Sequence, residues 1–328
     1  SPDSHLAKIS TDEFIIKGNY TDTASKIQIR ALLHTENTNV TPSIRQFVIS
    51  YKDNTPRLKS IEIPSDKIID VPSYSQYIRD KNIGSVICSP TSITMLLNRR
   101  NENLIVEETA WSCFDYDYEA FGNWLFNVAF ASSLGYESFV EYGNLKSLKR
   151  EIYSGYPVAV SVKYTNDINN LEYPYIENAP ITTAGHILVV RGFEKKDGID
   201  YVVVNDPAGK SNESVTRRYK LSEFESAWHR GSNIMYVIHD KEVEINNNRI
   251  EASLELKNNK ENLYSVLVND TYLDLSSDFV KTILITYDNG LTFEYLVPYN
   301  NHYLALENKN KCVIYIIGSD GFTYVCNC

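Results

Sequence analysis

The first stretch of the chain alternates between apolar and polar positions. Residues 25–33 carry apolar side chains at most odd positions and polar side chains at positions 26, 28 and 30, which is typical of a half-buried strand. Residues 47–51 alternate in the same way, and the polar residues 36–39 form a turn between the two stretches. Because two or three strands are not stable as a sheet alone, residues 1–60 are expected to be an N-terminal β-strand segment. This segment either packs against the rest of the chain or is a truncated β-domain.

The pattern from 61 to 240 mixes helical and strand periods. A helix is expected to begin just after Cys88, with Pro90 in its first turn, where the missing N–H costs nothing. Two more helices are expected over 123–133 and 144–155. Strands are expected to follow over 158–162, 186–194 and 199–205. Helices followed by a run of strands predict an α+β fold.

The helical period disappears near Lys241. Beyond it, strand patterns are separated by two turn signals, at 288–290 and 318–321. Residues 241–328 are therefore expected to form a small β-sandwich domain.

Composition excludes several classes of protein. The 328 residues are 43% hydrophobic and 23% charged, as in an ordinary globular protein. A net charge of -10 disfavours binding to nucleic acid, because a polyanion is repelled. No run of apolar residues is long enough to span a membrane, and no signal segment is visible in this chain. Metal and nucleotide motifs are absent, so no metal or cofactor is expected, and nothing indicates the oligomeric state.

Five cysteines are too few and too scattered for a disulfide scaffold. Cys312 lies before a turn, and either Cys326 or Cys328 beyond that turn could come within disulfide range of it. Cys113 lies in an aromatic stretch with no nearby histidine, which favours a buried thiol.

Cys88 is the candidate nucleophile. At the N-terminus of a helix, free N–H groups and the helix dipole stabilise a thiolate, and a cysteine nucleophile needs that stabilisation. The alternative is a small residue packed under the start of the helix. Twelve residues earlier in the chain, Gln76 can supply one oxyanion donor, while the backbone N–H of Cys88 supplies the other.

His186 opens one of the predicted strands and is the candidate base. A five-residue loop over 194–198 would place Asp206 directly opposite His186 in an antiparallel hairpin, with Cβ atoms about 5 Å apart. A slip of one residue would bring Asn205 to that position instead. Either side chain can orient an imidazole ring, so the sequence contains a nucleophile, a base and an orienting residue in a plausible order.

These residues lie in motifs that resemble the C39-like cysteine peptidase family, which is papain-like in fold. The motifs are Val71-Pro72-x-x-Ser75-Gln76, Cys88-Ser89-Pro90-Thr91-Ser92, Gly122-Asn123-Trp124-x-Phe126-Asn127, Thr183-x-Gly185-His186-x-Leu188 and Val203-Val204-Asn205-Asp206-Pro207. The resemblance covers about residues 71–238. It implies that Cys88 is the nucleophile, His186 the base, Asp206 the orienting residue and Gln76 an oxyanion donor, in a peptidase domain over 61–240.

The predicted function is that of a cysteine peptidase, which cleaves an amide bond in a peptide or protein through a thioester intermediate. Two alternatives stay open: a peptidoglycan amidase or acyl transferase with the same triad, and an inactive surface protein that binds a partner. Asn123 and Trp124 are expected to line the substrate cleft. The expected location is secreted or on a bacterial cell surface.

Overall fold

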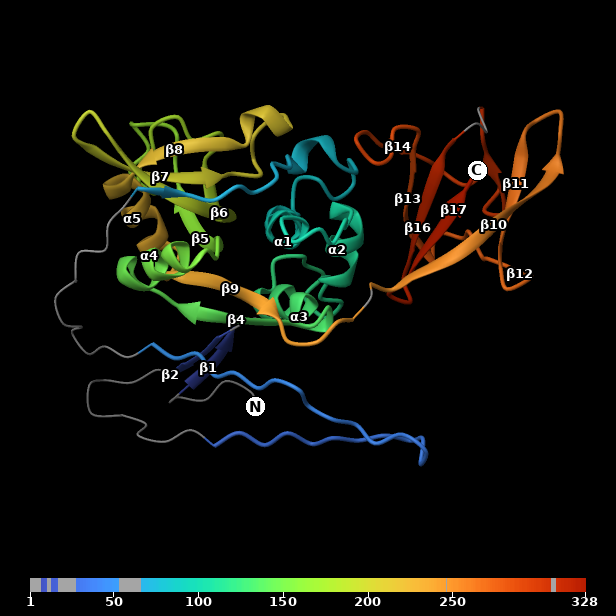
Figure 1. Ribbon diagram of the computed structural model, residues 1–328, viewed down its shortest axis with the longest axis horizontal. Helices are drawn as coiled ribbons and strands as arrows, with labels where there is room; N and C mark the ends of the chain where they lie inside the picture. The colour runs from blue at the N-terminus through green and yellow to red at the C-terminus, as the bar shows by residue number, and fades with distance from the viewer. Residues whose placement is uncertain (1–6, 11–12, 17–27, 53–65, 246, 308–310) are drawn as a thin grey trace.

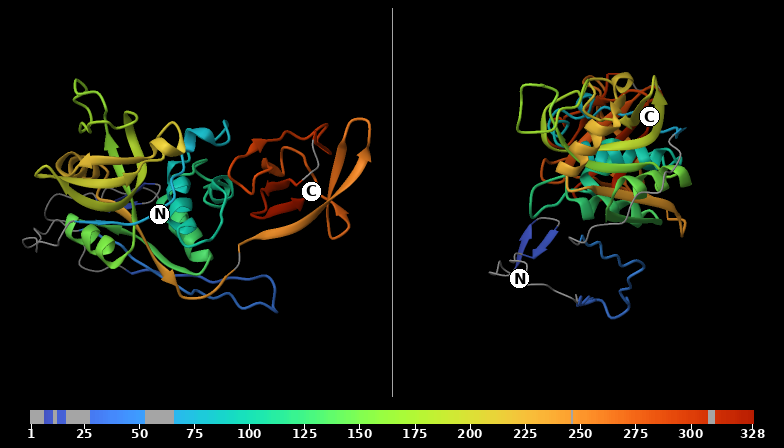
Figure 2. Two further views of the ribbon diagram at one scale, coloured as in Figure 1. Left: turned by 45° about the horizontal axis from the view of Figure 1, so that its top comes forward. Right: turned by 90° about the vertical axis from the view of Figure 1, so that its left-hand side faces the viewer.

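The structure is a computed structural model that describes residues 7–10, 13–16, 28–52, 66–245, 247–307 and 311–328. Two large sheets dominate the described part, and helices α1 and α2 lie between them (Figures 1 and 2). None of the helices in this part has the length and apolar content needed to cross a bilayer. Helices packed on antiparallel strands form the α+β arrangement predicted from the sequence.

The first large sheet is antiparallel, with strands in the order β4-β9-β5-β6-β7-β8 and β3 paired with β6. Its strands are β3 (Lys67–Ile68), β4 (Tyr136–Tyr142), β5 (Val158–Tyr164), β6 (Thr183–Lys196), β7 (Ile199–Asn205), β8 (Thr216–Lys220) and β9 (Ile234–Lys241). The central strand β5 is buried along nearly all its length, because helices cover it and apolar residues point to both faces. This sheet therefore carries the main hydrophobic core.

The helices of this region are η1 (Gln76–Ile78), α1 (Cys88–Asn98), α2 (Val106–Ser112), α3 (Trp124–Ser133), α4 (Leu145–Ser154), η2 (Asn212–Ser214) and α5 (Leu221–Arg230). The predicted starts of α1, α3 and α4 are confirmed. Asn123 and Asn144 cap α3 and α4 with their side chains, and Gly155 ends α4 in a left-handed conformation. Helix α1 is buried along most of its length and packs on β5 and β6, which fixes the position of its first residue.

The C-terminal sheet follows the order β12-β11-β10-β17-β16-β13-β14, with β15 paired to β11. Its strands are β10 (Arg249–Asn258), β11 (Leu263–Val268), β12 (Thr271–Tyr272), β13 (Val280–Thr286), β14 (Glu294–Tyr295), β15 (Leu304–Ala305), β16 (Val313–Gly318) and β17 (Thr323–Asn327). It has a hydrophobic cluster of its own. The C-terminal region is thus β-rich, as expected, and its status as a separate domain stays a prediction.

The predicted N-terminal strands are wrong within the described residues. A hairpin of β1 (Ala7–Ser10) and β2 (Glu13–Ile16) is present, but residues 28–52 contain no strand. Residues 25–27 of the first predicted strand lie outside the described residues. The segment touches the body through side chains, for example Arg45 to the carbonyl of Ser132. An alternating pattern makes a strand only where a neighbouring backbone supplies hydrogen bonds, and no strand in the described part of the chain pairs with residues 28–52.

The predicted register of the β6–β7 hairpin is also wrong. The turn contains two residues, Asp197 and Gly198, rather than five, and both have positive φ angles, as tight hairpin turns require. At a point further along the two strands, a bulge between Val190 and Gly192 changes the register again. Val190 pairs with Val204, so Asp206 is not directly opposite His186 but lies further along on the same side.

Candidate active site

Cys88 is the first residue of α1. It is partly exposed, whereas the residues that follow it in the helix are buried. The hydroxyls of Ser89 and Ser92 bond to Tyr236 and to the carbonyl of Ile187 at 2.9 and 3.3 Å. These bonds join the first turn of α1 to the strands beside it, so the sulfur of Cys88 is held at a fixed point of the sheet surface.

The pKa of the Cys88 thiol is lowered. Burial acts against ionisation, but the charge of His186 and a hydrogen bond from its ring outweigh it, helped by the backbone N–H groups of Ile187 and Ser89. The pKa of His186 is raised, because the carboxylate of Asp206 and the Cys88 sulfur overcome the effect of its burial. The two shifts together favour a thiolate beside an imidazolium.

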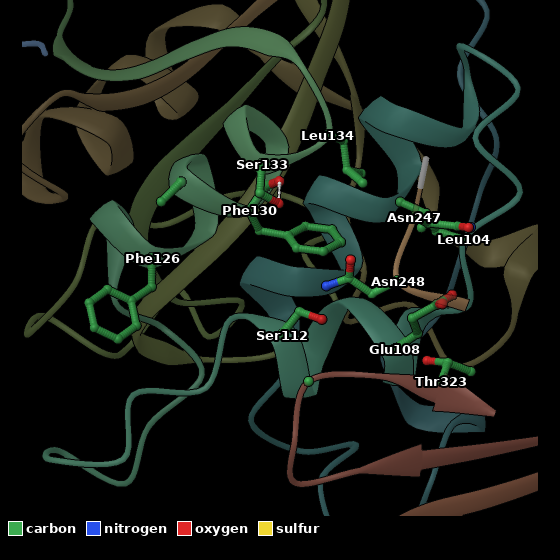
Figure 3. A pocket seen from close by; sticks show the side chains of 12 residues that line it. Leu104, Glu108, Ser112, Phe126, Phe130, Ser133, Leu134, Asn247, Asn248 and Thr323 are labelled. Carbon is green, nitrogen blue, oxygen red and sulfur yellow. Dashed lines mark hydrogen bonds between the residues drawn. The ribbon is translucent and has the colours of Figure 1, made fainter. Parts of the chain in front are cut away.

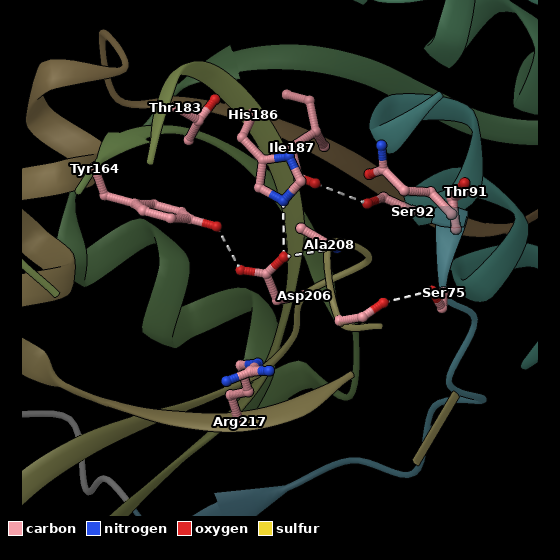
Figure 4. Close-up of polar contacts among 12 residues, drawn as sticks. Ser75, Thr91, Ser92, Tyr164, Thr183, His186, Ile187, Asp206, Ala208 and Arg217 are labelled. Atoms are coloured by element: carbon pink, nitrogen blue, oxygen red, sulfur yellow. Dashed lines mark hydrogen bonds and ion pairs between the residues drawn. The ribbon is translucent and has the colours of Figure 1, made fainter. Parts of the chain in front are cut away.

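The His186 ring is held on its far side by Asp206. Nε2 of His186 and Oδ1 of Asp206 are 2.8 Å apart (Figure 4), and only 5% of His186 is exposed. Because Asp206 takes Nε2, the other ring nitrogen, Nδ1, is left for Cys88. The structure therefore brings together the three residues that the sequence singled out, although by a different register.

Asp206 is itself anchored by three further donors. The hydroxyls of Tyr164 and Tyr219 both donate to Oδ2 at 2.8 Å, and the N–H of Ala208 donates to Oδ1 at 3.0 Å. Burial raises the pKa of Asp206, yet His186 and these donors lower it overall. The carboxylate is buried, but both of its oxygens accept hydrogen bonds. These bonds keep it ionised and hold it in one position. The sequence analysis missed the role of both tyrosines.

Asn205, the alternative orienting residue, has other partners. Its amide donates to the carbonyls of Val71 and Pro72 at 3.1 and 3.0 Å, and its oxygen accepts from Thr216 at 2.9 Å. These bonds tie the segment before η1 to β7 and β8. The side chain of Asn205 thus has a structural place, and Asp206 is the residue that contacts the ring.

Gln76 begins η1 and is 2% exposed. Its Nε2 donates to the carbonyl of Gly84 at 2.9 Å, while its Oε1 is buried without a hydrogen-bond partner among the described residues. The amide has a second N–H, and its role as an oxyanion donor stays a prediction. The next residue, Tyr77, is exposed, and its pKa is raised by partial desolvation and by the charges of Cys88 and Asp206. Tyr77 therefore lies close to the site.

Asn123 and Trp124 have other neighbours. The side chain of Asn123 caps α3 and donates to Asp115 at 2.7 Å. Trp124 lines a hollow between α3, β4 and the segment 45–50. A role for either residue in substrate binding stays a prediction.

Two hollows lie away from Cys88. The one that Trp124 lines has a volume of about 540 Å³. The other, of about 380 Å³, lies where α2 and α3 meet the C-terminal residues Asn247, Asn248 and Thr323 (Figure 3). Neither has Cys88 or His186 in its lining.

The remaining cysteines differ from Cys88. Cys312 is bonded to Cys328, with Cα atoms 5.0 Å apart, because the β16–β17 register places these two residues level with each other. Cys113 and Cys326 are free and buried. Burial raises the pKa of both thiols, that of Cys326 to about 12.

Solved structures of peptidases match about half of the chain. A putative C39-like peptidase from Bacillus anthracis matches at 15% identity over 54% of this chain and 100% of its own, with a TM-score of 0.40. Procathepsin L 3 from the larval midgut of Tenebrio molitor matches at 13% identity over 53% of this chain and 67% of its own, with a TM-score of 0.37. A double glycine motif protease from an AMS/PCAT transporter matches at 18% identity over 53% of this chain and 94% of its own, with a TM-score of 0.30.

No curated protein matches the chain in sequence. A family model described as the Peptidase_C39 like family matches residues 68–235, which is just over half of the chain. This match confirms the resemblance and the papain-like α+β fold that the sequence motifs implied. The chain belongs to the Peptidase_C39 like family.

Proposed function

We propose that this protein is a cysteine peptidase that hydrolyses an amide bond through Cys88, His186 and Asp206. The observation that carries the proposal is the position of Cys88 at the start of α1, beside an imidazole that Asp206 holds at 2.8 Å. Of the three free cysteines in the described part, Cys88 alone has a lowered pKa and is partly exposed. A nucleophile needs both properties.

The reaction follows from this arrangement. The Cys88 thiolate attacks the amide carbon, and the oxyanion accepts hydrogen bonds from the Cys88 N–H and the Gln76 amide. His186 then gives its proton to the leaving amine, and a thioester remains on Cys88. Neutral His186 next takes a proton from water, the hydroxide attacks the thioester, and the acid leaves with Cys88 restored. Asp206 holds the ring and stabilises its positive form throughout.

Active-site titration tests the proposal directly. A peptide-based thiol electrophile is expected to label one residue, Cys88, in the wild type, and the same preparation should hydrolyse a peptide library. His186→Ala should slow both reactions, and Cys88→Ala should abolish them. Labelling of Cys113 as fast as Cys88, or no effect of His186→Ala, would contradict the proposal and would favour the inactive binding protein.

Acyl transfer uses the same first half of the reaction. An added amine can intercept the thioester in place of water, so the products separate a hydrolase from a transferase or a peptidoglycan amidase. A peptide or protein substrate is proposed from family membership. A location outside the cytoplasm is proposed from the Cys312–Cys328 disulfide, because such bonds persist in oxidising compartments.

A further inference from the structure

The C-terminal sheet contacts the loop that follows Gln76. This loop, residues 79–86, connects η1 to α1. On its first part, Asp80 Oδ2 accepts a hydrogen bond of 2.9 Å from the hydroxyl of Thr282 on β13. The indole N–H of Trp111 on α2 donates to the same hydroxyl at 3.0 Å. Asp80 and Thr282 are both buried, so water does not compete for this contact.

Glu107 makes a second connection between the sheet and the loop. Its Oε1 accepts from the hydroxyl of Tyr295 on β14 at 2.6 Å and from the backbone N–H of Asp80 at 3.2 Å. Glu107 on α2 is fully buried. These donors satisfy its Oε1, whereas Oε2 has no hydrogen-bond partner among the described residues and lies 3.9 Å from Nη1 of Arg79. The guanidinium of Arg79 also lies 5.8 Å from the ring centroid of Phe293. Three residues of the C-terminal region thus surround the start of the loop.

The loop in turn holds Gln76. The carbonyl of Asp80 accepts from the N–H groups of Ile83 and Gly84 at 3.1 and 2.7 Å. The carbonyl of Gly84 then accepts from Nε2 of Gln76 at 2.9 Å. A Cβ on Gly84 would lie 2.9 Å from the carbonyl oxygen of Gln76 and 3.1 Å from that of Asp80. The loop is therefore closely packed, and Asp80 cannot shift without moving the group that anchors Gln76.

We infer that the C-terminal sheet positions the oxyanion donor of the peptidase, with Thr282 and Tyr295 as positioning residues that act through Asp80 and Glu107. The inference rests on the proposed function for its effect on catalysis. It assigns the C-terminal region a part in the reaction at the Gln76 side of the site. Cys88 lies on α1, and His186 lies on β6 and is held by Asp206.

The test replaces the hydroxyl of Thr282. Thr282→Val removes the hydrogen bond to Asp80, whereas Thr282→Ser retains the hydroxyl and the bond. Thr286→Val is the matched control. Thr286 is also buried on β13, but its hydroxyl bonds Asp288 within the C-terminal region. Three properties are measured: kcat and KM for a peptide, affinity for a peptidyl aldehyde, and the rate of Cys88 alkylation by iodoacetamide. The aldehyde forms an oxyanion on Cys88, whereas alkylation does not.

Thr282→Val is expected to lower kcat and aldehyde affinity by about 10-fold each, less than the loss of an oxyanion donor outright. KM and the alkylation rate should stay unchanged, and Thr282→Ser and Thr286→Val should behave as the wild type. Tyr295→Phe removes only a hydroxyl and should lower kcat and aldehyde affinity in the same way as Thr282→Val. It replaces Thr282→Val as the test if that variant does not fold. Equal aldehyde affinity in all variants would overturn the inference.

Hydrogen exchange separates this inference from the proposed function. The N–H groups of Ile83 and Gly84 should exchange faster in Thr282→Val than in Thr286→Val, whether or not the protein cleaves peptides. Unchanged exchange would overturn the positioning role. A wild type that neither hydrolyses peptides nor labels at Cys88 would overturn the proposed function alone, and exchange would still decide whether the sheet holds the loop.

Discussion

At the scale of single residues, Asp206 is the most constrained charge of the site. It is fully buried and accepts from His186, Tyr164, Tyr219 and the Ala208 N–H. A carboxylate that accepts this many hydrogen bonds stays ionised and is held in one position. The position of the His186 ring, and through it the ionisation of Cys88, therefore depends on a carboxylate that substrate binding does not need to move.

The sequence predicted the residues with distinctive chemistry and not the ones that support them. Cys88, His186 and Asp206 stand out because each lies at the end of a predicted helix or strand and within a motif. Few other cysteines, histidines or aspartates in the chain do both. Tyr164 and Tyr219 belong to a set of 24 tyrosines. Their alternation on buried strands is typical of core residues, and only the fold reveals that both hydroxyls reach the same carboxylate.

The reactivity of the cysteines gives the first prediction. Cys88 forms its thiolate as the pH rises through its lowered pKa, so its alkylation rate should rise at a lower pH than that of an ordinary thiol, whose pKa is about 8.5. In His186→Ala this rise should move to higher pH, because the charge and the hydrogen bond of the imidazole no longer oppose the effect of burial. Peptide mapping of alkylated protein measures the rates, and Cys113 is the internal control. Equal rates for the two thiols at neutral pH would contradict the expected shift.

The orienting role of Asp206 gives the second prediction. Asp206→Ala should lower kcat by about 10- to 10⁴-fold, because the ring loses its anchor and its counter-charge. Asp206→Asn should retain more activity, since an amide oxygen still accepts from Nε2. Asn205→Ala should change stability more than rate, because its bonds go to Val71, Pro72 and Thr216. The opposite ranking in folded proteins, measured by peptide hydrolysis, would make Asn205 the orienting residue.

At the scale of elements, the β6–β7 hairpin explains why a wrong register still gave the right pair. The strand pattern fixed which side of β7 Asp206 occupies, but not where along β6 it lies. The two-residue turn and the bulge before Gly192 shift the strands. Asp197-Gly198 is typical of a two-residue turn and a glycine within a strand pattern indicates a bulge, but the assumption of a five-residue loop used neither signal. Asp206 keeps its side and reaches His186 diagonally, because such neighbours are within reach of long side chains.

Helix α2 shows a different limit of sequence patterns. Its seven residues include Glu107 and Glu108, which are both buried because they bind residues of the C-terminal region. A helix that buries charged residues has no apolar stripe, so periodicity does not predict it. The N-terminal residues 28–52 show the converse error. Their alternating pattern predicts strands, but no described strand lies beside them to pair with.

Gly192 gives the prediction that belongs to this scale. It pairs with Ile68 on β3, and a Cβ would lie 2.4 Å from the carbonyl oxygen of Lys67. Gly192→Ala should lower the free energy of unfolding by about 1–3 kcal/mol, because β3 must move off the sheet. Gly185→Ala on the same strand meets no atom within 4 Å and is the control. Urea unfolding measures both, and equal losses would mean that β3 adapts freely.

At the scale of the whole molecule, the sequence placed a boundary near Lys241 but did not predict how the two parts meet. Asp80, Glu107 and Thr282 are polar residues far apart in the chain, and such residues are usually exposed. In the structure they are buried together. An apolar cluster of Ile105, Leu284 and Ile317 lies at the same contact. A buried interface between regions cannot be read from periodicity within either region.

Cleavage of the connection tests whether this interface holds by itself. Residues 242–245 are exposed, so a protease should cut there and leave an intact C-terminal fragment. The pieces should still elute as one species in native buffer, because Arg249 binds Glu108 with two nitrogens at 3.1 and 2.8 Å and the apolar cluster stays covered. They should separate only in denaturant.

The cut complex should keep the Cys88 alkylation rate of the intact protein. Removal of the C-terminal fragment in denaturant, followed by refolding of the remaining piece, should leave alkylation intact but lower peptide hydrolysis, since loop 79–86 loses Thr282 and Tyr295. Separate peaks in native buffer directly after the cut would mean that the interface is weak. In that case, the covalent connection at 242–248, rather than the buried contacts, would keep the sheet beside the active site.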